Sequence, residues 1–123
     1  MLPRGFRALL ASFPGEASPP GGDVLLAVAG DEVVGQVLVV RHDDGAARLE
    51  RMYVVEPFQR QGIASRLLGA AVAHARVLGY RRIVLDVLAE RTGARRLYES
   101  HGFAPIEPYT DYGRPMVFLG RDV

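Results

Sequence analysis

The chain is 123 residues long, carries a formal net charge of +1 and is 49% hydrophobic, with no cysteine. This length provides for one domain with one hydrophobic core, spanning residues 1–123. The small net charge argues against a general nucleic-acid-binding protein, the absence of cysteine excludes disulfides and thiolate catalysis, and no apolar run reaches the length of a membrane span.

The N-terminal segment, from Gly5 to Phe13, is predicted to form a short helix. It carries arginine and lacks the continuous apolar core of a secretory leader, so we expect a cytoplasmic protein. Three prolines and three glycines between residues 14 and 22 predict a loop.

Three strands separated by tight turns are predicted next. The apolar run from Val24 to Ala29 ends at Gly30-Asp31, which is a hairpin signal, and Val33 to Arg41 continues as the second strand. Asp44-Gly45 marks the next turn, and Ala46 to Val55 is the third strand. These residues predict an antiparallel meander.

Helices and strands alternate in the second half. Apolar residues recur at helical spacing from Gly62 to Leu78, and Gly79 follows as a helix-ending glycine. The apolar run Ile83 to Leu88 has the pattern of a buried parallel strand. A second helix is predicted from Thr92, as its N-cap, to His101, with Gly102 as the stop. With two short closing strands, this order predicts an α+β fold with a mixed sheet.

The loop before the first long helix has the features of an anion site. It reads Gln59-Arg60-Gln61-Gly62-Ile63-Ala64-Ser65 and lies directly between a strand and a helix. The first N–H groups of a helix have no intrahelical partner, and the helix dipole adds partial positive charge there. Arg60 and Arg66 add full charges. We interpret the loop as a phosphate or pyrophosphate site; the alternatives are an ordinary helix-start glycine and a solvated Arg66.

Several motifs in order resemble the GNAT superfamily of N-acetyltransferases. Gln59, Gly62 and Ala64 fit the acyl-CoA pyrophosphate loop of that superfamily, Gln/Arg-x-x-Gly-x-Gly/Ala. Residues 94–103 are similar to its A-x-x-L-Y-x-x-x-G-F segment, and the likeness covers roughly Gly21 to the C-terminus. The resemblance implies a GNAT-like α+β fold: a mixed, mostly antiparallel sheet flanked by helices and splayed at a central parallel strand pair.

The resemblance also implies acetyl-CoA as co-substrate and acetyl transfer to a primary amine of a small molecule, by direct attack in a ternary complex. The pantetheine arm would lie in the splay, and the backbone N–H of Tyr53 or Val54 would polarise the thioester carbonyl. Val55 would also line the arm. The cofactor-binding residues implied are Met52, Tyr53, Val54, Gln59, Arg60, Gln61, Gly62, Ile63, Ala64, Ser65 and Arg66.

Two residues are candidates for proton transfer. Tyr98 matches the superfamily's tyrosine that protonates the leaving thiolate; the alternative is a core aromatic residue. The glutamate that many relatives carry on the preceding strand is replaced by Arg48, which cannot act as a base. Because a side-chain period of two places Arg48, Glu50, Met52 and Val54 on one face, we hypothesise that Glu50 is the base, directly or through water. The alternative for Glu50 is a surface cross-strand ion pair.

Other features point to partners and to a second hypothesis. Relatives carry a further strand and helix before Gly5, so we expect an exposed sheet edge and a homodimer, unless the N-terminal segment covers that edge. The polar aromatic residues from Tyr109 to Arg114 form a candidate wall for the acceptor. No metal site is expected. Arg48 and Arg91, at positions where relatives carry other residues, favour the alternative of a non-catalytic acyl-CoA-binding or partner-binding module.

Overall fold

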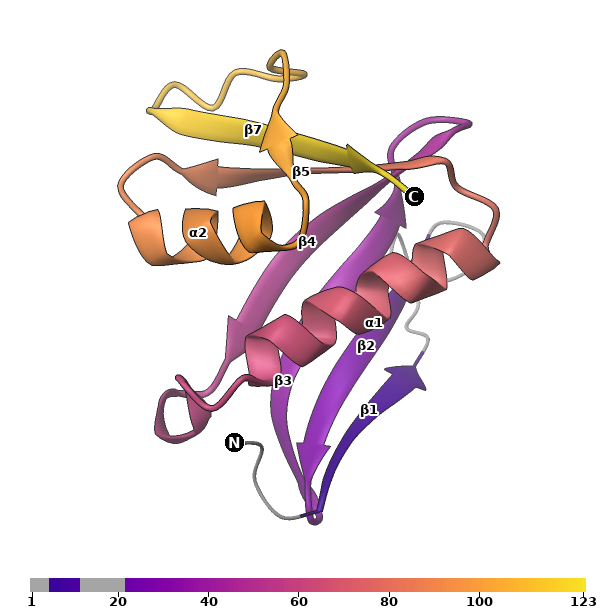
Figure 1. Cartoon of the computed structure of the whole chain (residues 1–123), viewed down its shortest axis with the longest axis vertical. Helices are drawn as coiled ribbons and strands as arrows, with labels where there is room; N and C mark the ends of the chain where they lie inside the picture. Colours follow the sequence, from indigo (N-terminus) through magenta and orange to yellow (C-terminus); the bar gives the residue numbers. More distant parts are fainter. Residues whose placement is uncertain (1–4, 12–21) are drawn as a thin grey trace.

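The computed structural model describes residues 5–11 and 22–123, and only the backbone of residues 8–11. The described strands form one seven-stranded sheet in the order β1-β2-β3-β4-β5-β7-β6 (Figure 1). The elements are β1 (Phe6–Ala11), β2 (Gly22–Ala29), β3 (Glu32–Arg41), β4 (Ala46–Val54), the 3₁₀ turn η1 (Glu56–Phe58), α1 (Ile63–Val77), β5 (Arg82–Leu88), α2 (Thr92–Ser100), β6 (Ala104–Pro105) and β7 (Met116–Asp122). Among these strands only β4 and β5 pair in parallel, which confirms the predicted fold class.

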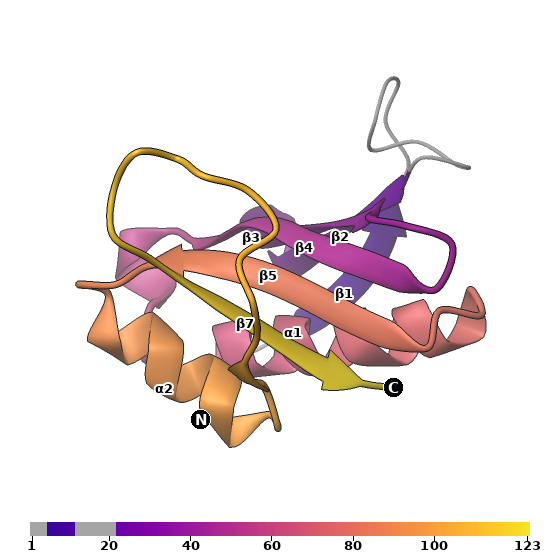
Figure 2. The same cartoon turned by 90° about the horizontal axis from the view of Figure 1, so that it is seen from above.

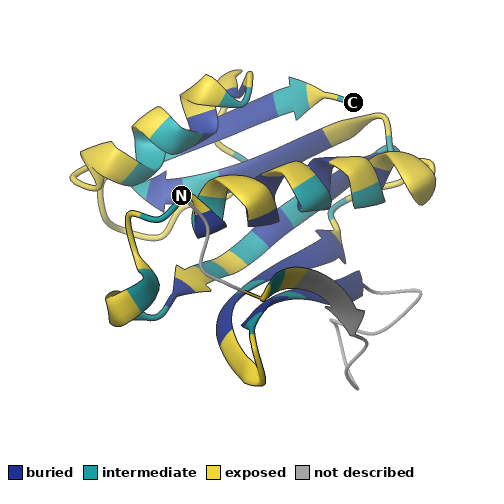
Figure 3. Ribbon diagram, turned by 60° about the horizontal axis from the view of Figure 1, so that its bottom comes forward, coloured by how far each residue is buried: buried dark blue, intermediate teal, exposed yellow. Residues whose placement is uncertain are grey.

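Both helices lie on one face of the sheet, and the loop between β6 and β7 arches over the other face (Figure 2). The main core lies between α1 and the sheet, and buried residues follow the inner side of the helix (Figure 3). Leu67 and Leu68 of α1 are fully buried there with Ile83 and Leu85 of β5. Since each such side chain contributes about 1.5–3 kcal/mol by burial, this face fixes α1 against the sheet.

The N-terminal segment is the main difference from the sequence-based prediction. The helix expected from Gly5 to Phe13 is wrong: residues 6–11 form the edge strand β1, paired antiparallel with β2. A short apolar segment carries a weak helical signal, and pairing satisfies the backbone groups along the edge of β2. β1 therefore covers the sheet edge that we expected to be exposed, and the homodimer was predicted from that exposure. The oligomeric state stays a prediction. Residues 12 and 13 and most of the loop expected over 14–22 lie outside the described residues.

The remaining predicted elements are confirmed, with small shifts at their ends. The third predicted strand ends at Val54, and the long helix starts at Ile63 after Gly62 as its N-cap. The N-cap of α2 is Arg91, so the expected capping by Thr92 is wrong. The closing strands are unequal, with two residues in β6 and seven in β7.

β4 contains a β-bulge at Arg51, whose φ is 53°. Leu38 of β3 is the partner of Glu50, whereas Gln36 is the partner of Tyr53. Two residues of β4 therefore stand opposite one residue of β3 between these pairs. A bulge of this kind reverses the alternation of side chains beyond it.

The bulge corrects the face assignment made from sequence periodicity. Leu49, before the bulge, and Val54, after it, both belong to the core cluster under α1, and Met52 packs against that cluster. Arg48 and Glu50 lie on the opposite face, together with the loop between β6 and β7. The prediction that these two residues share a face with Met52 and Val54 is therefore wrong.

The parallel pair of strands is short and then opens. β4 and β5 are paired over three residues, from Ala46 with Arg82 to Arg48 with Val84. Beyond that point each strand continues without the other, toward the N-termini of α1 and α2. The predicted splay is confirmed, and it leaves backbone groups of both strands available along the gap.

Candidate functional site

A cavity of about 730 Å³ opens where β4 and β5 separate. Its walls are residues 49–54 of β4, residues 85–88 of β5, the first turns of α2 and the loop that precedes α1. Tyr112, Arg114 and Met116, from the end of the β6–β7 loop and the start of β7, close its far side. The cavity therefore reaches from the predicted anion loop through the splay to the face opposite the helices.

The first turn of α1 presents free backbone amides. Arg60 and Gly62 have positive φ values of 64° and 83°, and the first backbone bond of the helix runs from the Arg66 N–H to the Gly62 carbonyl. Among the described residues, no backbone acceptor pairs with the amides of residues 63–65, and Gly62 has no side-chain cap. A second cavity of about 230 Å³ lies against this turn. Three free amides at the positive end of the helix dipole favour the binding of an anion at this turn.

Hydrogen bonds tie the loop to its neighbours. The side-chain amide of Gln59 donates to the Val54 carbonyl at 2.8 Å, and that of Gln61 donates to the Pro57 carbonyl at 3.2 Å. The Ser65 hydroxyl lies 2.9 Å from Nε2 of His101, at the end of α2. No local pattern indicated this contact, because Ser65 and His101 are far apart along the chain.

The predicted loop residues do not all face the cavities. Gln59, Arg60 and Ala64 line both of them, and Gly62, Ile63 and Ser65 line the smaller one. Gln61 and Arg66 belong to neither lining set. The guanidinium of Arg66 lies over the Phe6 ring instead, 5.8 Å from its centroid.

The backbone of β4 distinguishes between the two amides predicted to polarise a carbonyl. The Val55 N–H donates to the Val34 carbonyl of β3 at 2.9 Å. Successive amides of an extended strand point to opposite sides. The Val54 N–H therefore points away from β3 and into the gap, whereas the Tyr53 N–H points toward β3.

Tyr98 lies in the wall of the larger cavity and is 8% exposed. Its ring packs edge-to-face against Phe103, with centroids 6.0 Å apart. No residue in the described part of the chain hydrogen-bonds its hydroxyl. Burial raises the pKa of Tyr98 above its ordinary value of 10, Arg91 lowers it and the charge of Asp86 raises it further. Tyr98 is both a core aromatic residue and a protonated phenol in the cavity wall.

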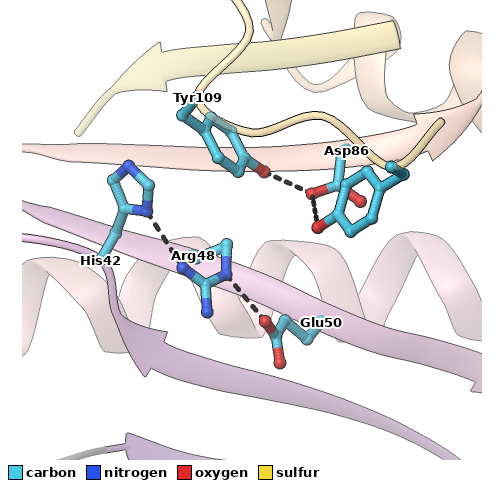
Figure 4. Close-up of polar contacts among 6 residues, drawn as sticks. His42, Arg48, Glu50, Asp86 and Tyr109 are labelled. Carbon is cyan, nitrogen blue, oxygen red and sulfur yellow. Dashed lines mark hydrogen bonds and ion pairs between the residues drawn. The ribbon is translucent and has the colours of Figure 1, made fainter. Parts of the chain in front are cut away.

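Arg48 and Glu50 form an ion pair along one strand (Figure 4). The Arg48 Nε lies 2.7 Å from Oε1 of Glu50, and each side chain is about one-quarter exposed. Arg48 Nη1 also lies 3.1 Å from Nδ1 of His42, whose pKa is lowered by burial and by the Arg48 charge. The observed ion pair joins two residues of the same strand, whereas the predicted alternative was a cross-strand pair, and its Glu50 side chain lines the cavity.

Sequence reasoning missed one acidic residue of the site, Asp86 of β5. Its Oδ2 accepts hydrogen bonds from the hydroxyls of Tyr109, at 2.6 Å, and Tyr112, at 3.0 Å (Figure 4). Burial, followed by the bond to Asp86, raises the pKa of both tyrosines above the ordinary value of 10. The available signal was a single acid within the apolar run of residues 83–88.

Arginines outnumber acids among the described residues that line the larger cavity. The four arginines are Arg51, Arg60, Arg91 and Arg114, and the two acids are Glu50 and Asp86. Such a cavity favours anionic ligands. Within residues 5–11 and 22–123, no group of three or more acidic or histidine side chains could hold a metal ion. The same ranges contain no helix with the length and apolarity needed to cross a bilayer.

Comparison with known proteins identifies relatives of this architecture. Residues 3–103 match the family model described as "Acetyltransferase (GNAT) family". The chain is 36% identical to the N-acetylaspartate synthetase of Danio rerio over 98 residues, which is 79% of this chain and 35% of the relative. It is 34% identical to the uncharacterized N-acetyltransferase YsnE of Bacillus subtilis over 86 residues, 68% of this chain and 57% of the relative. The chain thus spans between about a third and just over half of these relatives.

Solved structures share the fold. A GNAT family acetyltransferase from Elizabethkingia anophelis with acetyl-CoA bound has a TM-score of 0.80 at 20% identity, covering 97% of this chain and 99% of that one. A Bacillus subtilis acetyltransferase in complex with CoA has a TM-score of 0.79 at 20% identity, covering 96% and 99%. At this level of identity the comparison establishes the shared fold alone.

Proposed function

Because residues 3–103 match the family model, the chain belongs to the GNAT acetyltransferase family, and we propose that it transfers an acetyl group from acetyl-CoA to a primary amine of a small molecule. One observation carries the proposal. The larger cavity leads from Arg60 and Ala64 at the start of α1, past the inward Val54 N–H, to the Tyr98 ring and the Glu50 carboxylate. An acyl donor and an acceptor could meet within it.

Acetyl-CoA would bind with its pyrophosphate at the loop before α1. The unpaired amides of residues 63–65 and the charge of Arg60 support this placement. The pantetheine arm would extend along the gap beside residues 52–54 of β4, which have no strand partner on the β5 side because the β4–β5 pairing ends at Arg48. The Val54 N–H would then donate to the thioester oxygen and stabilise the negative charge that develops there.

The chemistry requires one bond to form and one to break. The amine nitrogen attacks the thioester carbon, the C–N bond forms, the nitrogen loses one proton to solvent, and the C–S bond breaks to release CoA thiolate. Tyr98 would give its proton to that sulfur and regain one from solvent. Its buried position supports this role, because the raised pKa keeps the phenol protonated at neutral pH.

The ammonium form of the acceptor must lose a proton before it attacks. Glu50 would accept that proton, directly or through a water molecule. Its position in the cavity wall supports the role, and the bond from Arg48 to Oε1 would hold the carboxylate in place and leave Oε2 for the proton. Arg48 would thus be a positioning residue beside the base.

The acceptor would carry a carboxylate as well as an amine. The excess of arginine around the cavity supports this, because CoA phosphates would engage Arg60 and leave Arg91 and Arg114 near the acceptor end. The name of one relative, N-acetylaspartate synthetase, points to the same class of compound. A dicarboxylic amino acid is the first acceptor to test.

A second candidate function is a GNAT module that binds acyl-CoA or a partner without catalysis. The observation that favours it is Arg48, which stands where a base is expected and occupies one oxygen of Glu50. An acyl-CoA-binding module would bind acetyl-CoA, and amines would not increase the release of CoA thiol.

The experiment is a two-part measurement on the purified chain. Native mass spectrometry with and without acetyl-CoA reports binding stoichiometry and tests the expected homodimer. Thiol release is then measured with L-aspartate, L-glutamate, glycine and propylamine. Enzyme-dependent release with one of these amines supports acetyl transfer. Binding without release supports the non-catalytic acyl-CoA-binding module. Absence of binding contradicts acetyl transfer and favours the partner-binding module.

A further inference from the structure

We propose that Asp86 binds the ammonium group of the acceptor and that Tyr109 and Tyr112 hold its carboxylate in place for this purpose. The inference rests on the proposed function, which it deepens by assigning the residue that recognises the amine. Neither a sequence motif nor a family position pointed to Asp86, and its contacts are the basis for the role.

Asp86 faces the acceptor side of the cavity. Its neighbours along β5, Leu85 and Val87, belong to the core under α1, so the alternation of the strand turns Asp86 to the opposite face. On that face it lines the larger cavity with Glu50 of the adjoining strand and Tyr112 of the loop. An acceptor that enters from this face would pass these side chains before it reached the thioester.

One oxygen of Asp86 is available to a ligand. Both tyrosine hydroxyls donate to Oδ2, and within the described residues no group donates to Oδ1. Every buried side-chain oxygen in the described part of the chain has a hydrogen-bond partner, so an unpartnered Oδ1 must be open to solvent in the cavity. Oδ1 can therefore accept a hydrogen bond from an ammonium group.

The two carboxylates of the cavity differ in how their charge is balanced. Glu50 has a guanidinium 2.7 Å away. Asp86 is bound by neutral phenols, and no arginine or histidine of the described residues lies within ion-pair distance of it. Burial of a carboxylate without a cationic partner is unfavourable, and a ligand ammonium would supply the missing partner through a charge-assisted hydrogen bond.

The phenols are themselves held by aromatic packing. The Tyr109 ring lies edge-on to His42, at 4.7 Å between centroids, and to Phe118, at 4.9 Å. Tyr112 stacks on Phe118 at 6.5 Å. Both tyrosines have raised pKa values and stay hydrogen-bond donors at neutral pH. Asp86 is therefore fixed before a ligand arrives, which reduces the entropy lost on binding.

The test is the variant Asp86→Asn. Asparagine has the size of aspartate, and its carbonyl can still accept bonds from both phenols, but it carries no charge to attract an ammonium. With the panel amine of highest kcat/KM, we expect the KM for the amine to rise about 10- to 100-fold. The dissociation constant of acetyl-CoA, measured by calorimetry, and the melting temperature should stay close to those of the unmodified protein. Asp31→Asn, at an exposed hairpin turn, is the control for the same change in net charge.

A second variant separates recognition from a structural role. Replacing both Tyr109 and Tyr112 by phenylalanine keeps the Asp86 charge and removes the bonds that position it. We expect a smaller rise in the amine KM than for Asp86→Asn. If Asp86 only anchors the loop, the double variant lowers the melting temperature while Asp86→Asn leaves the amine KM unchanged, and this result overturns the inference. If the unmodified protein releases no thiol with any amine, the proposed function itself fails and the inference falls with it.

Discussion

The substitution Tyr98→Phe is the sharpest test of the proposed acetyl transfer, because it removes one hydroxyl and keeps the packed ring. The ring is 8% exposed and contacts Phe103, and phenylalanine can make the same contact. Since none of the described residues hydrogen-bonds the hydroxyl, its loss should change the free energy of unfolding by about 1 kcal/mol or less. Binding of acetyl-CoA through the loop before α1 should be unaffected.

The chemical step should be strongly affected. Loss of a positioned general acid lowers the rate by about 10²- to 10⁴-fold, which corresponds to about 3–5.5 kcal/mol of transition-state stabilisation. The assay is single-turnover acetylation of the panel amine, stopped by rapid quenching. In this format slow release of product cannot conceal a change in the chemical step.

Tyr80→Phe is the matched control, because it removes the same hydroxyl from a partly exposed ring outside both cavities. Its single-turnover rate should equal that of the unmodified protein. A rate for Tyr98→Phe within about twofold of this control would refute the assignment of Tyr98 as the acid. Tyr98 would then be a core aromatic residue that happens to line the cavity.

Three further predictions test the loop, the core and the polar cluster. Gly62→Ala places a side chain at a φ of 83°, which costs about 1–2 kcal/mol, so acetyl-CoA should bind about 5- to 30-fold more weakly by calorimetry. Gly69→Ala, mid-helix with open space around it, is the control and should bind normally; equal affinities for the two variants would contradict the loop assignment. Leu67→Ala should lower the free energy of unfolding in urea by about 3–5 kcal/mol, because Leu67 is fully buried. Val77→Ala, at a site 83% exposed, should change it by about 0.5 kcal/mol or less. Similar values for the two variants would contradict the packing of α1 against the sheet. Burial and the neighbouring Arg48 guanidinium lower the pKa of His42 below its ordinary value of 6.5. Between the folded-state and unfolded-state pKa values the unfolded chain binds more protons, so the free energy of unfolding should rise with pH, and His42→Gln should reduce this pH dependence. An NMR titration midpoint of His42 above 6.5 would contradict the environment described.

Much of the site could be predicted from local sequence. Apolar residues at helical spacing located α1, and Gly62 at its start implied unpaired amides in the loop before it. Alternating apolar residues and Asp-Gly or Gly-Asp turns located β2, β3 and β4. These features depend on a residue and its near neighbours along the chain, so periodicity and turn chemistry were sufficient. Tyr98 was found through its motif, and the structure places it in the cavity wall.

Other parts depended on residues far apart in sequence. Residues 6–11 form a strand because the edge of β2 offers them backbone partners, which their own short pattern does not reveal. The bulge at Arg51 reverses the faces of β4, and arginine is not a residue type that signals positive φ. Asp86 joins Tyr109 only when the β6–β7 loop folds over the sheet. Local sequence patterns were therefore sufficient for most of the elements and for the unpaired amides at the start of α1. Which carboxylates share the cavity follows from the folded chain alone, because strand pairing, bulges and loop packing are long-range interactions.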